Sequence, residues 1–581
     1  MSVPDTAMSV PDAALLYERD GYNVTREDLK GRHVVGDGFL RAVVAAASDE
    51  PVRAYVSSRK AGEDFASRVR GIRPAVCVET IAFGDFRRLS RTGTLYLPGP
   101  GVGDHAFLRS RCGAAAYSIV GVTHTISSHR AMEAIAALMT APTMPWDALV
   151  CTSRAVRDAA DALLSAQADY LSWRFGRIER PLLAQLPVIP LGVHAADFAP
   201  DPAARARARA ALGLDEDTVL AVFVGRLSFH AKAHPHAMYR ALERVAQETG
   251  RKLALLQCGY FATEGIAGAF RTGAARFCPA VRALFADGRD PAARRAAFLA
   301  GDIFVSLSDN HQETFGLTPL EGMAAGLPVV VTDWDGYRDT VRDGVDGFRV
   351  PTFAPAPDTA SGLDLDHETG TLNYDRYIGN AAMAVAVDHD ALAARLRTLV
   401  EAPELRRRMG EAGRARVAEA FDWAVVHRLY RALYDDLAAM RAAEAGRAAG
   451  ARVSPVRPDP YRVFARYPTA HVGSDTLVEA RGTIGEWRGI AGDFLFGFAE
   501  TLAKEEEAAG VLGALSAGPL TVAALCERTG MAPSRGRIVV CQMMKAGVLA
   551  VAPPQGTGPA RALSADRGPC DGPPRSGKGL Q

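Results

Sequence analysis

The amino-acid sequence predicts an α/β fold of two doubly wound, Rossmann-like halves, followed by a small, mainly α-helical domain. Three observations lead to this prediction. Short apolar runs alternate with longer amphipathic stretches from residue 17 to about residue 445, which is the pattern of parallel strands joined by crossover helices. The pattern stops near residue 200 and then starts again. A stretch with four prolines between residues 450 and 473 separates a third unit from the two halves.

Composition excludes several classes of protein. The chain has 581 residues, of which 48% are hydrophobic, and its 67 basic and 66 acidic residues leave a formal net charge of +1. Such a balance of charges provides no overall electrostatic field that would attract nucleic acid or an anionic membrane. No apolar run reaches the roughly 18 residues of a membrane span, and the N-terminus lacks the order of a secretory signal. We expect a cytoplasmic protein, free or peripheral to the inner face of the membrane.

The first half is predicted over residues 17–200. Residues 1–16 hold a near-perfect tandem copy, MSVPDTA followed by MSVPDAA, and are predicted to be a disordered start. Buried strands are expected where four to seven mainly apolar residues occur together, at 51–57, 93–97, 117–122, 148–152 and 188–191.

The second half is predicted over residues 201–449. Its strands are expected at 219–224, 252–258, 303–307 and 328–332. Residues 351–380 are rich in Pro, Asp, Gly and Thr, so we expect an insertion loop there. Helices from residue 390 to about residue 449 then close this half.

The third unit is predicted over residues 474–552, after a linker at 450–473 and before a disordered tail at 553–581. A helix from Thr521, a turn at Gly530, a helix over 533–545 and a strand over 548–551 give a winged-helix outline. Arg535, Arg537 and Lys545 on the second helix suggest DNA binding. Acidic neighbours and the apolar stretch VVCQMM instead favour docking of an acceptor or homodimer formation through this unit.

The residues that indicate chemistry lie between Val305 and Val350. Glu313 follows an expected strand, and Glu321 lies eight residues later on the expected helix. Gly316 and Thr318 are small, which leaves the backbone N–H groups at the helix start free to meet a phosphate. Ligands of doubly wound folds bind at the carboxyl ends of the strands, so a phosphate-containing ligand is expected here.

Several motifs together resemble the retaining family 4 (glycosyl transferases group 1) glycosyltransferases of GT-B fold. The resemblance rests first on the spacing of the two glutamates and on the segment GMAAGLPVVVTD that follows them. The segment VFVGRLSFHAKAHP resembles the family's diphosphate-binding segment, and LPVIPLGVHAADF resembles its crossover between domains. GVTHTISS resembles the family's acceptor-side histidine segment, and LRRRMGEAGRARVAEAFDW resembles its closing helices. The resemblance extends over about residues 17–445.

The family resemblance implies a role for each matching residue. The substrate is expected to be a nucleotide-diphosphate sugar, from which a hexosyl group passes with retention to an unidentified acceptor. Neither a metal nor a further cofactor is expected. The implied catalytic residues are Glu313, His124, Arg226 and Lys232. The donor-binding residues are expected to be Arg226, Lys232, Glu313, Phe315, Gly316, Leu317, Thr318, Glu321, Gly36 and Gly38.

Within this set, Arg226 and Lys232 are expected to hold the diphosphate. Lys232 is one of only seven lysines against 60 arginines, and the two cations are not interchangeable in anion binding. Glu313 is assigned to hydroxyls of the donor sugar, Glu321 to those of the ribose, and His124 to the acceptor side. Gly36 and Gly38 are expected in a loop that approaches the donor phosphate.

Other features of the sequence leave alternatives open. Asp333-Trp334-Asp335 mimics a D-x-D metal motif, and residues 364–368 resemble a calcium loop without its glycine; neither is favoured as a metal site. His194, Asp335 and Asp339 depart from the family pattern and leave the donor sugar open. Base contacts are expected near residues 285–289. The alternative function is a regulator that senses nucleotide sugars and binds DNA through the winged helix.

Overall fold

The structure is a computed structural model that describes residues 13–23, 31–48, 50–177, 184–357, 359, 362–444, 446, 453–498 and 500–553. It divides into two compact units, residues 1–457 and 458–581, so the division falls inside the predicted linker. Residues 1–12 of the predicted disordered start and residues 554–581 of the predicted tail lie outside the described residues.

The first domain of the larger unit is built on a six-stranded parallel sheet with the order β3-β2-β1-β4-β5-β6. Its strands are β1 (Ala14–Tyr17), β2 (Val52–Val56), β3 (Val78–Ala82), β4 (Thr94–Leu97), β5 (Ser118–Val122) and β6 (Ala148–Val150). β1 begins three residues before the predicted start of the domain, so residues 13–16 are not part of a disordered start. Residues 188–191 form no strand and contribute only a single bridge, from Val188 to Cys151.

Helices cover both faces of this sheet. They are α1 (Arg19–Tyr22), α2 (Gly31–Ala46), α3 (Arg59–Ile72), α4 (Phe86–Thr92), α5 (Val102–Arg109), α6 (His129–Ala136) and α7 (Arg154–Phe175). Ser58, Ser128 and Ser153 precede α3, α6 and α7, and each side chain accepts a hydrogen bond from a backbone N–H of the first turn. These serine caps fix the helix starts that follow β2, β5 and β6.

The second domain repeats this topology, with the strand order β12-β11-β10-β7-β8-β9. Its strands are β7 (Val219–Val224), β8 (Leu253–Gly259), β9 (Arg282–Asp287), β10 (Ile303–Ser306), β11 (Val329–Thr332) and β12 (Gly347–Val350). Its helices are α8 (Pro202–Ala211), α9 (His236–Thr249), α10 (Glu264–Phe277), α11 (Pro291–Ala300), α12 (Leu317–Ala324) and α13 (Tyr337–Thr340). The prediction of two doubly wound, Rossmann-like domains is confirmed.

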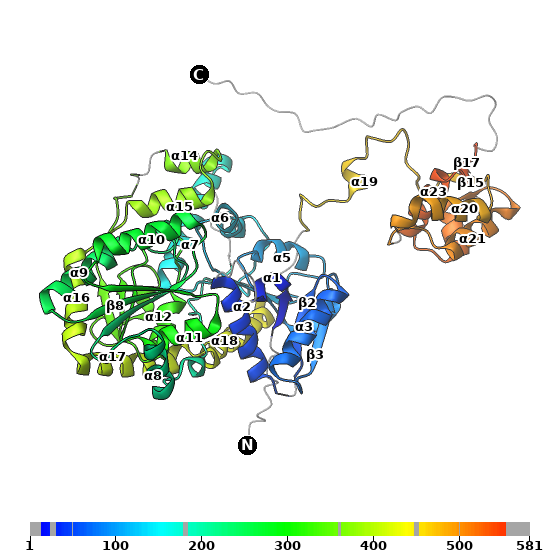
Figure 1. Cartoon of the computed structure of the whole chain (residues 1–581). Helices are drawn as coiled ribbons and strands as arrows, with labels where there is room; N and C mark the ends of the chain where they lie inside the picture. The colour runs from blue at the N-terminus through cyan, green and yellow to red at the C-terminus, as the bar shows by residue number, and fades with distance from the viewer. Residues whose placement is uncertain are drawn as a thin grey trace, which may run out of the picture. The chain divides into compact units, whose positions relative to one another are not determined.

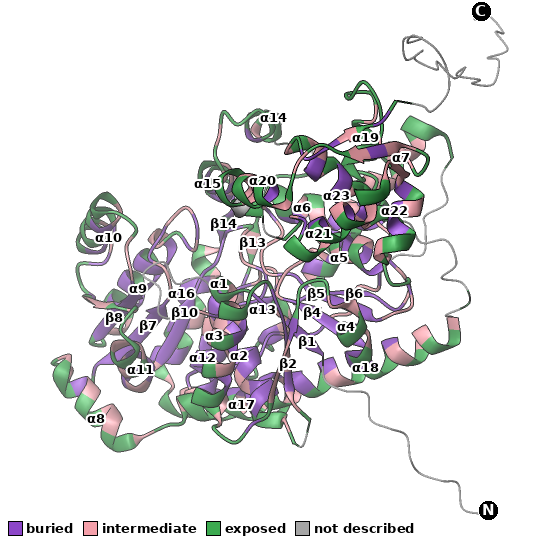
Figure 2. Ribbon diagram, turned by 90° about the vertical axis from the view of Figure 1, so that its right-hand side faces the viewer, coloured by how far each residue is buried: buried purple, intermediate pink, exposed green. Residues whose placement is uncertain are grey.

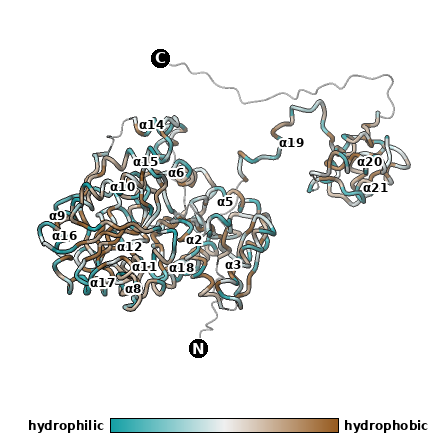
Figure 3. Tube along the Cα trace, viewed as in Figure 1, coloured by the Kyte–Doolittle hydropathy of each residue, from teal (hydrophilic) through white to brown (hydrophobic). Residues whose placement is uncertain are grey.

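The strands of the two sheets form the buried interior of this unit, as the purple ribbons of Figure 2 show. β5, β7 and β8 are buried at every position. In Figure 3, brown, hydrophobic stretches of the tube run through the part of the larger unit where Figure 1 labels β8. Parallel strands covered by helices on both faces read as continuous apolar runs, which explains why the sequence pattern located them.

The predicted insertion loop at 351–380 is wrong, because much of this segment is helical. It contains α14 (Leu363–Glu368) and α15 (Tyr374–Met383), and a small hairpin of β13 (Thr352–Phe353) with β14 (Ala386–Val387) frames it. Asn373 caps α15, its side chain accepting a hydrogen bond from the Arg376 N–H at 3.0 Å. The helices are short and polar, so their apolar period was too brief to recognise.

The closing helices are α16 (His389–Glu401), α17 (Pro403–Arg416) and α18 (Trp423–Glu444), with a π-helical turn at Val417–Phe421. α18 does not stay on the second domain. It packs beside α2 of the first, where the yellow helix lies against blue elements in Figure 1. The Arg441 guanidinium of α18 donates to Ser118 Oγ at 2.7 Å. The sequence prediction extended the second domain to residue 449, which is one helix further than the structure does.

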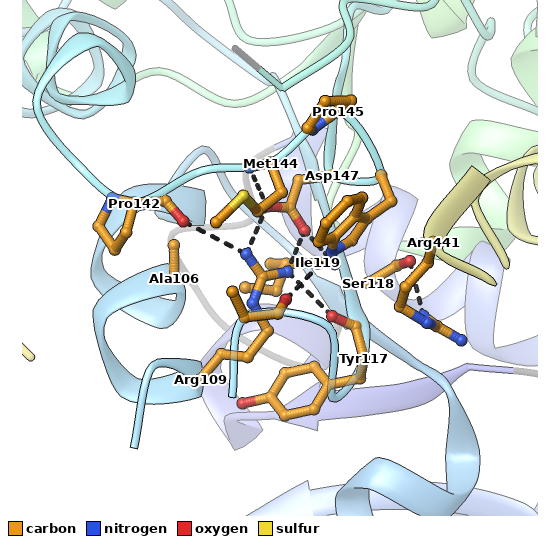
Figure 4. A network of polar contacts seen from close by, with 12 residues as sticks. Ala106, Arg109, Tyr117, Ser118, Ile119, Pro142, Met144, Pro145, Asp147 and Arg441 are labelled. Carbon is orange, nitrogen blue, oxygen red and sulfur yellow. Dashed lines mark hydrogen bonds and ion pairs between the residues drawn. The ribbon is translucent and has the colours of Figure 1, made fainter. Parts of the chain in front are cut away.

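A buried ion pair organises the core of the first domain (Figure 4). Arg109 and Asp147 are both fully buried, and Arg109 Nη2 donates to Asp147 Oδ2 at 2.8 Å. Asp147 also accepts hydrogen bonds from the N–H groups of Ile119 and Met144, at 3.0 and 2.8 Å. Arg109 further donates to the Tyr117 carbonyl at 2.9 Å. The pair ties α5, β5 and the loop before β6 together.

The smaller unit has a three-stranded antiparallel sheet, β16-β15-β17, and a core around Trp487. Its strands are β15 (Leu477–Ala480), β16 (Leu520–Thr521) and β17 (Leu549–Val551); its helices are α19 (Pro460–Val463), α20 (Ile484–Ile490), α21 (Glu505–Ala514), α22 (Val522–Thr529) and α23 (Pro533–Lys545). Thr521 caps α22, and Gly530 ends it with a φ of 68°. The helices and the strand lie where they were expected, while the winged-helix class itself stays a prediction.

We predict that Asp147→Ala lowers the free energy of unfolding by about 3–5 kcal/mol, because the buried guanidinium of Arg109 loses its partner. Urea unfolding followed by the fluorescence of the adjacent buried Trp146 measures this. The matched control is Asp215→Ala, which removes an exposed ion pair with Lys252 at 3.0 Å and should change the free energy by less than about 1 kcal/mol. Equal effects of the two substitutions would contradict the structural role of the buried pair.

Candidate active site

A cavity of about 570 Å³ lies between the two Rossmann-like domains. The second domain contributes loops that follow β7, β8, β9 and β10, and the first contributes the start of α2 and the segment after β5. Both sheets thus present their carboxyl ends to one space. In each sheet the strand order also reverses at its centre, and such switch points are where doubly wound sheets bind ligands.

Arg226, Lys232 and Glu313 meet at the switch point of the second sheet. β7 and β10 are neighbours there; Arg226 and Lys232 follow β7, while Glu313 follows β10. The Lys232 ammonium donates to Glu313 Oε2. Residues 81 positions apart are therefore brought together as the sequence predicted.

The Glu313 carboxylate is held in its charged form. Burial alone would raise its pKa, but the Lys232 charge and hydrogen bonds outweigh burial, so the pKa lies below its usual range. Those hydrogen bonds come from Lys232 on Oε2 and, on Oε1, from the N–H groups of Thr314 and Phe315 at 3.3 and 3.4 Å. Glu313 is therefore a hydrogen-bond acceptor and not a proton donor at neutral pH.

Arg226 lies beside this pair and is oriented by two acceptors. Its Nη2 donates to the Ala231 carbonyl and to Gln312 Oε1, each at 2.9 Å. Both bonds among the described residues use one nitrogen, which leaves Nε and Nη1 as donors for a ligand in the cavity. Lys232 and Arg226 thus give the cavity two cations on one wall.

The start of α12 forms the adjoining wall, where Phe315, Gly316, Leu317 and Thr318 all line the cavity. Gly316 precedes the helix with a φ of 94°, and a Cβ there would lie 2.1 Å from the Tyr337 ring. Only glycine fits this turn. The Thr318 hydroxyl is buried and forms no hydrogen bond among the described residues. Free N–H groups, the helix dipole and this hydroxyl together suit an anion.

Glu321 lies behind the wall instead of on it. It is 4% exposed and does not line the cavity. Arg294 Nη2 donates to Glu321 Oε1 at 2.5 Å, and Arg294 is the member of this pair that lines the cavity. The sequence prediction placed the acidic residue correctly on α12 but missed its cation, because no spacing links α11 to α12.

The prediction that Gly36 and Gly38 form a phosphate-binding loop is wrong. Both lie inside α2, are buried and do not line the cavity. A Cβ at Gly36 would lie 2.2 Å from the Gly21 carbonyl oxygen, and one at Gly38 would lie 2.3 Å from Trp423 Nε1. These glycines allow close packing of α2 against its neighbours. Gly31 and Arg32, at the start of the same helix, line the cavity instead.

His124 lines the cavity from the first domain, as predicted for the acceptor side. Burial lowers the pKa of His124 to about 4, so its imidazole is neutral at physiological pH. The His124 carbonyl accepts a hydrogen bond from the Thr314 hydroxyl, next to Glu313. The ring also hydrogen-bonds the Pro98 backbone, and a carbonyl there takes the single N–H of a neutral imidazole, so the other ring nitrogen can accept a hydrogen bond from a sugar hydroxyl.

Sequence reasoning missed several residues that line the cavity. A glycine lies at or just after the end of three successive strands: Gly225 follows β7, Gly259 ends β8 and Gly288 follows β9. A Cβ at Gly259 would lie 1.9 Å from the Gly225 carbonyl oxygen. This recurring glycine was a signal that could have been found. Gln312, Tyr374 and Asp375 were missed too, the last two because their segment was taken for a loop. Gly288 and Arg289 do lie in the region expected to contact the base.

Asp335, the last residue of the DWD segment, and Asp339 contact the first domain. The Ser153 hydroxyl donates to Asp335 Oδ1 at 3.1 Å, and the Arg154 N–H donates to Asp339 Oδ2 at 2.7 Å. No group of three or more His, Cys, Asp or Glu side chains is arranged to hold a metal ion within the described ranges. Residues 364–368 form most of α14.

Residues 204–360 match the family model described as Glycosyl transferases group 1. D-inositol 3-phosphate glycosyltransferase of Kineococcus radiotolerans is 31% identical over 274 residues, 45% of this chain and 55% of the relative. Phosphatidyl-myo-inositol mannosyltransferase of Mycobacterium tuberculosis is 36% identical over 99 residues, 16% of this chain and 26% of the relative. The chain thus spans about half the length, or less, of these curated relatives.

Solved structures also resemble the chain at low identity. Sucrose-phosphate synthase from Thermosynechococcus elongatus is 16% identical, with a TM-score of 0.44 over 74% of this chain and 99% of the other. Anabaena HepE, crystallised with UDP, is 15% identical, with a TM-score of 0.46 over 69% of this chain and 96% of the other.

We predict that Asp335→Asn stabilises the protein by an amount that grows with pH. Burial, reinforced by the Glu313 charge, raises the pKa of Asp335 to about 7, whereas an aspartate in the unfolded chain titrates near pH 4. Between these values the folded state holds a proton that the unfolded state has lost, so this residue lowers stability as pH rises towards 7. Asparagine stays neutral and tolerates the φ of 41° at this position.

Urea unfolding of the parent and of Asp335→Asn at several pH values measures this effect. The difference in the free energy of unfolding should increase from pH 4 to pH 7 by an amount on the order of 3 kcal/mol and then level off. A difference that does not change with pH would contradict the assignment of a protonated Asp335.

Proposed function

Because residues 204–360 match the family model described as Glycosyl transferases group 1, we propose that the chain is a retaining glycosyltransferase. In this proposal it needs no metal ion and transfers a hexosyl group from a nucleotide-diphosphate sugar. The observation that carries the proposal is the convergence of Lys232, Arg226 and the start of α12 on one cavity between two Rossmann-like domains. These groups are the kind that bind a diphosphate and stabilise it as it leaves.

In this proposal, the diphosphate lies against the start of α12, between Lys232 and Arg226. The charge on the leaving phosphate increases as the glycosidic bond breaks, and two cations with fixed positions favour that charged state over the ground state. Together with the N–H groups of α12, the cations supply the positive charge that a metal ion supplies in other transferases. The diphosphate would share the Lys232 ammonium with Glu313.

Glu313 is proposed to accept hydrogen bonds from hydroxyls of the donor sugar. Its charged carboxylate beside Lys232 suits that role and does not suit a general acid. Retention then follows from attack of the acceptor on the face that the diphosphate leaves, with the departing phosphate oxygen taking the acceptor proton. Positioning and electrostatics would supply most of the rate.

The acceptor is proposed to enter beside His124, where the neutral imidazole orients a hydroxyl. Arg32 also lines this side of the cavity. The names of the curated relatives place inositol phosphate among their acceptors, so it belongs in any panel of acceptors tested with this chain. The nucleoside base is proposed to lie near Gly288 and Arg289.

The alternative of a DNA-binding regulator gains no specific support. On α23, Arg535 Nε donates to Glu507 Oε1 at 2.9 Å, and its other nitrogens donate to the carbonyls of Thr501 and Leu502 at 2.8 and 2.9 Å. Of the three cations that suggested DNA binding, Arg535 is thus used inside the domain. In the described part of the chain, no helix is both long and apolar enough to cross a bilayer.

We predict that the purified protein releases nucleoside diphosphate from a nucleotide sugar, and that Lys232→Ala and Glu313→Ala each slow release at least about 100-fold. The assay supplies UDP-, GDP- and ADP-sugars in turn, with inositol phosphate or cell extract as acceptor, and measures the free nucleoside diphosphate. The loss follows from removing a cation that contacts the leaving group, or the carboxylate that holds that cation.

Lys252→Ala is the matched control, because it removes a lysine whose exposed pair with Asp215 lies away from the cavity. It should release nucleoside diphosphate at the parental rate. The assignment of the site fails if Lys232→Ala remains as active as Lys252→Ala. The function itself fails if the parent cleaves none of the donors with any acceptor.

A further inference from the structure

The segment from α14 to α15, residues 363–383, reaches across the cavity to the first domain. The ring of His367 in α14 lies 3.8 Å from that of His129 at the start of α6, measured between centroids. The Tyr374 hydroxyl at the start of α15 lies 2.8 Å from Ser127 Oγ and 3.4 Å from Thr125 Oγ1. Figure 1 shows α14 and α15 above the second sheet and beside α6.

Tyr374 also contacts the second domain through Gln312, whose Nε2 donates to the tyrosine oxygen at 3.1 Å. Gln312 in turn accepts from Arg226 at 2.9 Å. One hydroxyl therefore joins Ser127 of the first domain to Arg226 on the diphosphate side. These three links are all in place in the structure.

The directions of two of these hydrogen bonds follow from Arg226. A guanidinium only donates, so the Gln312 amide must present its oxygen to Arg226 and its NH₂ to Tyr374. The tyrosine oxygen then accepts from Gln312, while either hydroxyl can be the donor between Tyr374 and Ser127. The orientation of Gln312 depends on both of its neighbours.

We propose that Tyr374 is a positioning residue that orients Arg226 through Gln312. The proposal rests on the function proposed above. Ser127 of the first domain holds the tyrosine hydroxyl where it accepts from Gln312 Nε2. Gln312 then holds Nη2 of Arg226, so that Nε and Nη1 are left for the diphosphate. The orientation of the cation thus depends on residues of both domains.

Tyr374→Phe tests this proposal, because it removes the hydroxyl and keeps the ring. With the sugar nucleotide that the parent cleaves, and with water as the acceptor, kcat should fall about tenfold, the usual effect of one hydrogen bond. The KM for the donor should change less than about twofold, since the lost orientation matters most when charge develops on the leaving phosphate. The midpoint of thermal unfolding should stay close to that of the parent.

A double-mutant cycle separates a positioning role from a general structural role. Arg226→Ala alone should slow cleavage, and adding Tyr374→Phe to it should cause no further loss, because the tyrosine acts through the arginine. Multiplied losses would overturn the proposal. Tyr377→Phe is the matched control on the same helix: its ring stacks on His367 at 4.2 Å, outside the chain from Ser127 to Arg226, and kcat should equal that of the parent.

The outcomes also distinguish a failure of the proposed function from a failure of the positioning role. A parent that cleaves no donor, in any of the assays above, contradicts the proposed function. A parent that cleaves a donor while Tyr374→Phe matches it in kcat contradicts the positioning role alone. Isothermal titration with UDP, GDP or ADP adds a reading without turnover. These nucleotides carry the full charge of the leaving phosphate, so Tyr374→Phe should bind the best of the three up to about tenfold more weakly than the parent. Unchanged binding would contradict the positioning role, and complete loss of binding would show that the tyrosine supports the fold of the site instead.

Discussion

The cavity depends on how Trp423 fixes the two domains of the larger unit against each other. Its ring packs where Gly38 of α2 and Gly192 of the crossover leave room; a Cβ at either glycine would lie within 2.5 Å of the indole. The backbone adds to this, because the Trp423 N–H donates to the Val193 carbonyl at 3.0 Å. Trp423 is the first residue of α18. This helix follows the last part of the second domain and runs along the first domain. Together with the contacts of Asp335 and Asp339 with the start of α7, this junction holds residues of both domains around one site.

Charge is arranged locally in a molecule that is nearly neutral overall. The formal charge of +1 argued against any broad field, and the structure instead concentrates cations at one switch point. Each cation is held by a partner: Lys232 by Glu313, Arg226 by Gln312 and Arg294 by Glu321. Groups held in this way need little reorganisation when an anion arrives, which is the property that electrostatic catalysis requires. On the first domain, neutral His124 lines the cavity together with the Arg32 guanidinium.

The sequence predicted a structural feature well where the cause of that feature lies within one short segment of the chain. Buried strands such as β7 and β8 were found because parallel strands are apolar at every position, whereas β3 and β9, half-buried at the sheet edges, were missed. Lys232 and Glu313 were found by resemblance of motifs. Gly36 and Gly38 were misplaced because a glycine that allows close helix packing and a glycine in a phosphate loop look alike in sequence. Arg294 and Tyr374 depend on tertiary contacts between separate segments, and no local pattern reveals those.

The central claim is that the cavity holds a nucleoside diphosphate between Lys232 and the start of α12, and a crystal structure of the complex tests it most directly. Crystals would be grown with UDP, GDP or ADP, chosen by the largest rise in thermal stability. The account predicts phosphate oxygens within hydrogen-bond distance of Lys232 Nζ, of an Arg226 nitrogen and of a backbone N–H at residues 316–318. A nucleotide bound with its phosphates away from Lys232 and α12, or bound outside the cavity, would contradict it.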